Sequence, residues 1–584
     1  MSGSVEINGY QSDWVAEDIA QRFESWDAGK QVWKKRVGEV IQYVYATSTR
    51  ETANVENEWS HSTHIPKITQ IHDNLGANYA SALFSKREFF TFDPATPDEA
   101  TAKKRQAIVN YLRTKHDYSG FNDTMKQLLN DWVQTGNCFA HVEYVRETAY
   151  DQSTGEEVVV YEGPRVNRIS PYDIVFDFTA ESFQKSPKMF RRLISRGDFA
   201  RYVLERPDAG FDMERVEDVL NYYTSMSGYT DIDINKHNQQ RMDGFDSYAA
   251  YLRSGKVELI EFIGDIWDSS TNTLMKDRLI TVADRKFVVR NQGQDDFQGF
   301  GKIYHSSWRK RPDNLWGQGP LDNLVGMQYL INHLENARAD AFDQMLFPDR
   351  VHVGNVQIEE NGPVTNYYID DGQGSVSNLA PDATVLQADL QIQIKEAQME
   401  AFAGAPREAM GIRTAGEKTA FEIQQLQNAA GRLFQVKIED FEREIIEPIL
   451  NGELEVAVKN LSSADVAKVI DDDDGVIEFL TITKEDLTAR GKLKARGASH
   501  FAKRAQLVQE LQQFSLVLAN DPEMKVHFPP KLRAKAWADA LNFENMELFV
   551  PFGSVSEQLE LNRTMQAAQN AQALTDAVEV PPEV

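Results

Sequence analysis

Apolar residues recur every three or four positions in several stretches of the chain, a spacing that places them on one face of a helix. The stretches that predict helices in the first half of the chain are 14–50, 66–84, 97–117, 120–135, 196–206 and 212–222. Within about 137–177, and again within 256–308, apolar and polar residues alternate, which predicts strands. Residues 226–252 are rich in Gly, Asn, Asp and Ser and predict a surface loop. Together these stretches predict an α+β fold.

The stretch from about residue 312 to 450 has the strongest pattern. Its first helix has a predicted apolar face of Leu324, Met327, Ile331, Leu334, Ala337 and Ala341. Pro348 ends this helix, because a proline inside a helix lacks a donor and clashes with the preceding turn. The insert at about 349–386 alternates polar and apolar residues between glycine turns, which predicts a small β-containing unit. A second helix is predicted at about 387–403, and Gly404 and Pro406 impose a break after it.

A polar loop, GIRTAGEKTA, follows the break, and a long helix is predicted from about Lys418 to Pro448. A helix of this length needs neighbours on both sides, which a ring of identical subunits would supply. Arg413 and Lys418 flank the loop, and they would meet phosphates transiently if the loop faces a channel. Alternatively, they neutralise helix ends or pair with Glu408 and Glu417.

The part of the chain after Leu450 has two patterns. GELEVAV and VIEFLTI predict strands on either side of Asp471 to Asp474. RAQLVQELQQFSLVLAN and LRAKAWADALN then predict helices, and the Gln- and Ala-rich end predicts a fraying helix or a disordered tip. A chain of 584 residues is too long for one simple core, so several domains are expected.

The chain carries a net charge of −27. Because nucleic-acid affinity depends on neutralising phosphates with Lys and Arg, such a chain is a poor general DNA binder. Its carboxylates could line a surface along which DNA slides without adhering, or they could simply keep the protein soluble. The single cysteine, Cys138, excludes an intrachain disulfide and is expected to be a packed thiol. With neither a secretory signal nor an apolar run of about 18–20 residues, a soluble intracellular protein is expected.

The motifs of common catalytic and metal sites are absent or incomplete. No Gly-Lys pair has both the upstream glycine and the following Ser or Thr of a nucleotide-binding P-loop. His61 and His64 could be metal ligands, but without a nearby partner they are interpreted as surface or capping histidines. Asp471 to Asp474 fit a solvated acidic turn better than a calcium loop, because the calcium-loop spacing leaves Ile470 and Thr481 at ligand positions. The sequence therefore predicts no catalytic residue, no cofactor and no metal.

Four stretches resemble the portal (head-to-tail connector) protein of tailed double-stranded DNA bacteriophages. RPDNLWGQGPLDNLVGMQYLINHLENARADAFDQMLFP is similar to the start and body of that family's first stem helix, and residues 402–411 to its second stem helix and break. IRTAGEKTAFEIQQLQ resembles the tunnel loop running into the long bent helix, and PRVNRISPYDIVFD resembles a strand pair of the wing. The likeness covers about residues 120–450 in sequence order. The N-terminal helices and the tail do not match.

The resemblance implies a division of the chain into family regions. These are a wing at 1–319, stem helix 1 at 320–346, a clip at 347–386, stem helix 2 at 387–410, a tunnel loop at 411–418, a long wing helix at 419–450, a wing return at 451–494 and a crown with a C-terminal tail at 495–584. The tunnel-loop residues implied to face DNA are Arg413, Thr414, Glu417 and Lys418. The clip residues implied to bind partners are Asn366, Tyr367, Tyr368, Asp370 and Asp371.

The resemblance also implies a function without enzymatic activity. Twelve copies would form a ring at one capsid vertex of the virion, assembled in the host cytoplasm, through which double-stranded DNA passes without sequence specificity. The implied partners are the terminase large subunit, then a head–tail adaptor, and the major capsid and scaffolding proteins, with no membrane. Twelve chains of −27 would carry about −324, which would repel phosphates from the channel wall. The alternatives are another head–tail connector or tail-tube protein, and a nuclease or motor component.

Overall fold

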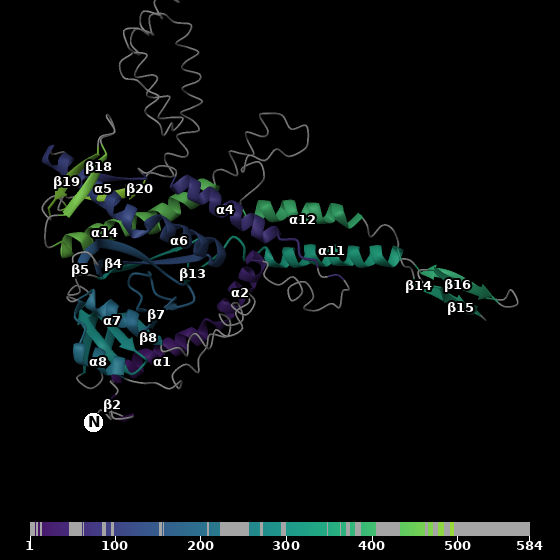
Figure 1. Cartoon of the computed structure of the whole chain (residues 1–584), viewed down its shortest axis with the longest axis horizontal. Helices are drawn as coiled ribbons and strands as arrows, with labels where there is room; N and C mark the ends of the chain where they lie inside the picture. Colours follow the sequence, from purple (N-terminus) through teal and green to yellow (C-terminus); the bar gives the residue numbers. More distant parts are fainter. Residues whose placement is uncertain are drawn as a thin grey trace, which may run out of the picture. The chain divides into compact units, whose positions relative to one another are not determined.

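The computed structural model describes the chain in segments that end at residue 495. They are residues 6–7, 10–11, 14–45, 61, 63–84, 89–94, 99–150, 155, 157–206, 209–221, 256–268, 272–293, 300–346, 349–354, 356–361, 364–369, 374–379, 387–403, 433–461, 465–470, 477–483, 487 and 491–495. The chain divides into two units, 1–498 and 499–584, and the described residues all belong to the first. Helices and strands are mixed in this unit (Figure 1), which confirms the predicted α+β class.

The N-terminal part supplies the helices α1 (Trp14–Gly29), α2 (Gln31–Tyr45), α4 (Lys67–Leu83), α5 (Glu99–Ser119) and α6 (Phe121–Thr135). The prediction of one continuous helix over 14–50 is wrong, because the chain turns at Lys30 between α1 and α2. The Lys30 ammonium donates to the Ile174 carbonyl at 2.8 Å and lies over the rings of Trp33 and Trp316. This contact across a large sequence distance fixes the break, and local periodicity does not reveal it.

Two antiparallel sheets follow among the described residues. The three-stranded sheet has the order β11-β4-β5, with β4 at Asn137–Tyr150, β5 at Glu157–Ile169 and β11 at Phe300–Ser307. The five-stranded sheet has the order β10-β9-β8-β7-β6, with β6 at Ile174–Phe176, β7 at Lys188–Ser195, β8 at Lys256–Asp268, β9 at Thr273–Ala283 and β10 at Phe287–Gly293. The helices α7 (Arg196–Leu204) and α8 (Met213–Asn221) lie where they were predicted. The predicted loop at 226–252 lies outside the described residues.

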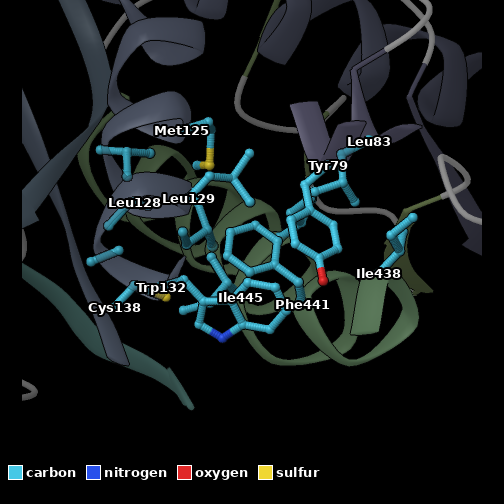
Figure 2. Close-up of a cluster of buried hydrophobic side chains, with 14 of the residues drawn as sticks. Tyr79, Leu83, Met125, Leu128, Leu129, Trp132, Cys138, Ile438, Phe441 and Ile445 are labelled. Atoms are coloured by element: carbon cyan, nitrogen blue, oxygen red, sulfur yellow. The ribbon is translucent and has the colours of Figure 1, made fainter. Parts of the chain in front are cut away.

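The largest buried apolar cluster joins the N-terminal helices, the three-stranded sheet and the long helix (Figure 2). The Trp132 ring of α6 packs edge-on against Tyr79 and Phe441, with ring centroids 5.5 and 5.1 Å away. Cys138 is fully buried in this cluster, and burial raises the pKa of its thiol well above the usual range. The expectation of a packed thiol is therefore confirmed.

The predicted helix–insert–helix pattern is present. Figure 1 shows α11 (Val325–Leu346) beside α12 (Ala388–Ala403), and the two helices are in contact. Between them in the sequence, β14 (Asp349–Val353) pairs with β17 (Ser375–Leu379) around a hairpin of β15 (Val356–Asn361) and β16 (Val364–Ile369). The alternating residues predicted a small β-containing unit, and the strands of the insert form two nested, two-stranded antiparallel ladders.

The end of the long helix differs from the prediction. Residues 433–441 are helical, a π turn η3 follows at Glu442–Ile446, and α14 continues over Glu447–Asn460. The helix therefore passes through Pro448, and GELEVAV, predicted as a strand, is helical. The Glu447 N–H donates to the carbonyl of Glu442, five residues earlier, which is the bond of a π turn. This wider turn lies directly before Pro448, which has no N–H to donate. The glycine of GELEVAV, Gly452, packs on β11, where an added Cβ would overlap the Tyr304 hydroxyl.

Shorter strands complete the described residues. They are β1 (Glu6–Ile7), β2 (Tyr10–Gln11), β3 (Phe90–Pro94), β12 (Arg309–Arg311), β13 (Asn314–Gln318), β18 (Asp465–Ile470), β19 (Ile477–Ile482) and β20 (Gly491–Ala495). The strand predicted from VIEFLTI is β19, which pairs with β18. The predicted turn at Asp471 to Asp474, the tunnel loop at 411–418 and the crown after Ala495 lie outside the described residues.

Candidate functional site

The helices α11 and α12 expose large apolar side chains to solvent. Phe342 of α11 is 50% exposed and Phe402 of α12 is 65% exposed. The same two helices also expose Leu330, Leu346, Leu390 and Ile394. Because α11 and α12 contact each other, these exposed side chains make the helix pair a candidate contact surface for another protein.

The buried face of α11 carries side-chain amides as well as apolar groups. Of its predicted apolar face, Leu324, Ile331 and Ala341 are buried, while Met327, Leu334 and Ala337 are only partly buried. The fully buried polar residues on this helix are Gln328, Asn332 and Asn336, one turn apart from each other. Because amides in a dry environment need partners, this face must satisfy them with hydrogen bonds.

Those partners come from the segment that precedes α4, residues 61 and 63–66, which we call the strap. The backbone N–H of Thr63 donates to Asn336 Oδ1 at 2.7 Å, and that of Ile65 to Asn332 Oδ1 at 3.2 Å. The N–H of His61 donates to the next position along the helix, Asp340 Oδ1, at 3.0 Å. Alternate backbone donors of the strap therefore meet every fourth residue of α11.

The geometry of the two elements explains this pairing. Two residues of an extended chain span about 6.6 Å, and four residues of an α-helix rise about 6 Å. We call this series of hydrogen bonds between the strap and α11 the ladder. Gln328 forms its last two bonds, because its Oε1 accepts the Ile68 N–H at 3.1 Å and its Nε2 donates to the Ile65 carbonyl at 2.6 Å. The side chains of one face of α11 thus accept alternate backbone N–H groups of the strap, as the carbonyls of a neighbouring β-strand would.

The two histidines considered as metal ligands belong to the same contact. His61 Nε2 lies 2.6 Å from Asp343 Oδ2, and Asn332 Nδ2 donates to His64 Nδ1 at 2.8 Å. Burial lowers the pKa of His64, which favours the neutral ring that this bond requires. Both histidines therefore position the strap on α11, a role beyond the surface or capping role expected for them. In the described part of the chain, no group of three or more His, Cys, Asp or Glu side chains could hold a metal ion.

A buried ion pair attaches α12 to α4. Lys67 Nζ lies 2.6 Å from Glu400 Oε1, and the two side chains are only 3% and 5% exposed. Lys67 also donates to Gln70 Oε1 at 2.9 Å. The strap and α4 are thus bound to both helices of the pair, through amides on α11 and a charge on α12.

The implied partner-binding residues of the insert are only partly described. Asn366, Tyr367 and Tyr368 lie in β16, where Tyr368 is opposite Gln357 of β15 and is 55% exposed. Asp370 and Asp371 lie outside the described residues. The four implied tunnel-loop residues, Arg413, Thr414, Glu417 and Lys418, also lie outside them.

Sequence reasoning missed a group of buried charges that joins the two sheets. Arg206 lies 3.2 Å from Glu143 of β4, and Arg290 of β10 lies 3.7 Å from Glu261 of β8. Burial alone would raise the pKa of Glu143, but Arg206 and Arg192 lower it to about 2. The contact between the two sheets is made by Arg192 of β7, which donates to His141 Nδ1 of β4 at 3.3 Å and lies 3.8 Å from Glu261. Each of these buried charges has an opposite charge nearby. Charged residues inside predicted strands were the signal that could have revealed it.

Among the described helices, none has a stretch long and apolar enough to span a bilayer. No protein-family model matches the chain, and no curated protein is significantly similar to it in sequence.

Proposed function

We propose that the chain is the subunit of a portal ring, the channel through which viral DNA enters and leaves a capsid. The observation that carries the proposal is the helix–insert–helix unit of α11, β14–β17 and α12, whose paired helices expose apolar side chains such as Phe342 and Phe402. This unit has the order of the stem helix, clip and stem helix that the sequence resemblance implies.

The exposed apolar side chains support self-assembly. Burying a large apolar side chain gains roughly 1.5–3 kcal/mol relative to exposure, so a helix pair with several of them is stabilised by a neighbour. A contact between two different faces of identical subunits yields a ring when its rotation closes. In the proposed ring, the α11–α12 pair of one subunit covers that of the next, and twelve subunits surround the channel.

The charges of the two helices suit a channel for DNA. Apart from Glu400, whose charge Lys67 neutralises, α11 and α12 carry five carboxylates, including Asp343 and Asp389, against the two cations Arg338 and Lys395. Helices that face DNA with this excess repel its phosphates and keep the duplex from adhering. The proposal assigns sparse phosphate contacts to Arg413 and Lys418 of the tunnel loop.

The insert is assigned to the clip, where partners dock. The exposed side chains Val351, Val353 and Tyr368 of β14 and β16 give it an apolar and aromatic surface. In the proposed sequence of events the terminase large subunit binds this surface during packaging, and a head–tail adaptor replaces it later. The major capsid and scaffolding proteins would contact the ring at the vertex of the virion.

The test is cryo-microscopy of the purified protein together with its mass in solution. The proposal expects rings of about twelve 66.3 kDa subunits with a central opening wide enough for a duplex, and a stem built by α11 and α12. Rings without a stem would favour the alternative of a head–tail adaptor or tail-tube protein. A stable monomer at micromolar concentration would contradict both.

A further inference from the structure

The β12–β13 hairpin places three consecutive cations, Arg309, Lys310 and Arg311, in a strongly acidic chain. Lys310 forms an ion pair with Glu444 of η3. Within the parts of the chain that the structure describes, Arg309 and Arg311 form no ion pair with a carboxylate. Arg309 lies opposite Gln318 of β13 and Arg311 opposite Asn314, with a register shift between the two arginines. Arg311 is exposed and Arg309 is partly exposed.

A further cation joins this hairpin from the long helix. Lys437 lies with its ammonium 4.6 Å from the centre of the Trp308 ring and donates to the Trp308 carbonyl. The Arg309 guanidinium lies 5.4 Å from the same ring. Burial, with Arg309 and Lys310 nearby, lowers the pKa of Lys437, while Asp440 raises it. Trp308 therefore holds a cation of the hairpin and a cation of the helix next to each other.

The carboxylates around this cluster are mostly engaged elsewhere. Asp322 is buried and lies 3.5 Å from Arg36, and Asp440 pairs with Arg443 at 2.7 Å. Arg309 and Arg311 act on Asp322 from a distance, since both lower its pKa, which burial raises. Asp313, in the turn of the hairpin, is exposed. The cluster thus has an excess of positive charge at its exposed edge, against the sign of the whole chain.

We propose that Arg309, Arg311 and Lys437, the hairpin cluster, form a contact surface for the phosphates of duplex DNA. The inference rests on the proposed function, which brings a duplex past the subunits. In the implied family regions, Arg309 and Arg311 fall in the wing, and Lys437 falls in the long wing helix that follows the tunnel loop in sequence and is described from residue 433. Guanidinium groups match the geometry of phosphate oxygens, and contacts of this kind bind any sequence.

The experiment compares two double variants of the full chain. Arg309→Gln/Arg311→Gln removes two charges from the cluster, and Lys126→Gln/Lys185→Gln removes two charges from exposed lysines elsewhere. Binding of a fluorescent duplex is measured between about 50 and 200 mM salt, with ring formation checked by microscopy. For the cluster variant, Kd is expected to rise about tenfold, and the slope of log Kd against log salt to fall by roughly one per lost contact. Arg309→Lys/Arg311→Lys should restore most of the binding.

The remaining outcomes show whether the hairpin cluster or the portal proposal is wrong. Intact rings with equal DNA affinity for both glutamine variants overturn the hairpin cluster and leave the portal proposal standing. Absence of rings from the unsubstituted protein overturns the portal proposal itself. Tighter binding of a polyglutamate peptide than of duplex DNA at the same salt would overturn the DNA assignment in favour of an acidic protein partner. A lowered thermal midpoint for the glutamine variant, not restored by lysine, would show a structural role and overturn the inference.

Discussion

Lys67 of α4 and Glu400 of α12 form an ion pair of 2.6 Å that is almost completely removed from solvent. A charge buried without its partner is costly, whereas a pair replaced by apolar groups of similar size costs little. Replacing one member of the pair should therefore lower the free energy of unfolding more than replacing both.

Glu400→Gln should destabilise the protein by about 3–5 kcal/mol, because the Lys67 ammonium stays buried without its counter-charge. The double variant Lys67→Met/Glu400→Leu should recover most of that loss. Urea unfolding of the three proteins gives both free energies. If the double variant is as unstable as the single one, the pair is not the reason for the loss.

Asn332→Leu should cost about 1–3 kcal/mol, because the Ile65 N–H and the Gln328 amide lose an acceptor in a buried position. Hydrogen exchange should become faster at the strap amides in particular. Gln344→Leu, at an exposed position of the same helix, serves as the control and should leave these amides protected. If the Ile65 amide exchanges equally slowly in the Asn332 variant, the proposed hydrogen bond between the strap and α11 does not protect it.

Acid should destabilise the protein through His141 of β4. Burial first, and then Arg192, Arg290 and Arg206, lower the pKa of this imidazole from 6.5 to about 3, although Glu143 opposes them. Since the unfolded chain takes up the proton near pH 6.5 and the folded chain does not, the stability contributed by His141 is present above 6.5 and declines as pH falls toward 3.

The test is a comparison of unfolding free energies with those of His141→Gln at several pH values. Between pH 7 and 5 the unsubstituted protein should lose roughly 2 kcal/mol more than the variant, at about 1.4 kcal/mol per pH unit below the pKa of the unfolded chain. Parallel pH profiles of the two proteins would show that another group is responsible.

Phe342→Asp and Phe402→Asp should each prevent ring formation while leaving the subunit folded, because both side chains are exposed in the single chain. Leu204→Asp, at an exposed position of α7, matches the change in chemistry and should still assemble. Mass in solution and microscopy measure the result. Rings from both phenylalanine variants would place the subunit contact elsewhere.

Arg413→Ala and Lys418→Ala should leave ring assembly intact and alter the packaging or retention of DNA, because these cations are the proposed phosphate contacts of the tunnel loop. An assay of packaged DNA in particles assembled with each variant measures this. Normal packaging with the double variant would remove the role.

Periodicity predicted most elements, and its failures have tertiary causes. The turn at Lys30 depends on carbonyls and rings far away in sequence, which no local window contains. The alternation in GELEVAV is typical of a strand, but this segment is part of the helix α14. The helix continues through Pro448 because of the π turn before it, and its side chains Ile449, Leu450 and Val456 are buried. β7 escaped notice because Arg191 and Arg192 interrupt its apolar residues, and their carboxylate partners lie elsewhere.

The candidate site was foreseen in outline only. The order of helix, β-containing insert and helix was readable from Pro348, the alternating insert and the second amphipathic stretch. In the sequence, the amide side chains of α11 look like the polar residues of an ordinary solvent-facing helix surface. They are buried because the strap covers them, and its residues Thr63 and Ile65 lie more than two hundred residues earlier in the chain. No pattern within one helix reveals such a partner.

The ladder between the strap and α11 fixes the rotation of that helix about its own axis. A slip of one residue would turn the helix by about 100° and separate Asn332 and Asn336 from their backbone donors together. Small intermediate rotations would break these bonds without forming others. A torque applied to α11 would therefore pass to α4 through the strap and through the bond between Gln328 and the Ile68 N–H, and the two helices would move as one body.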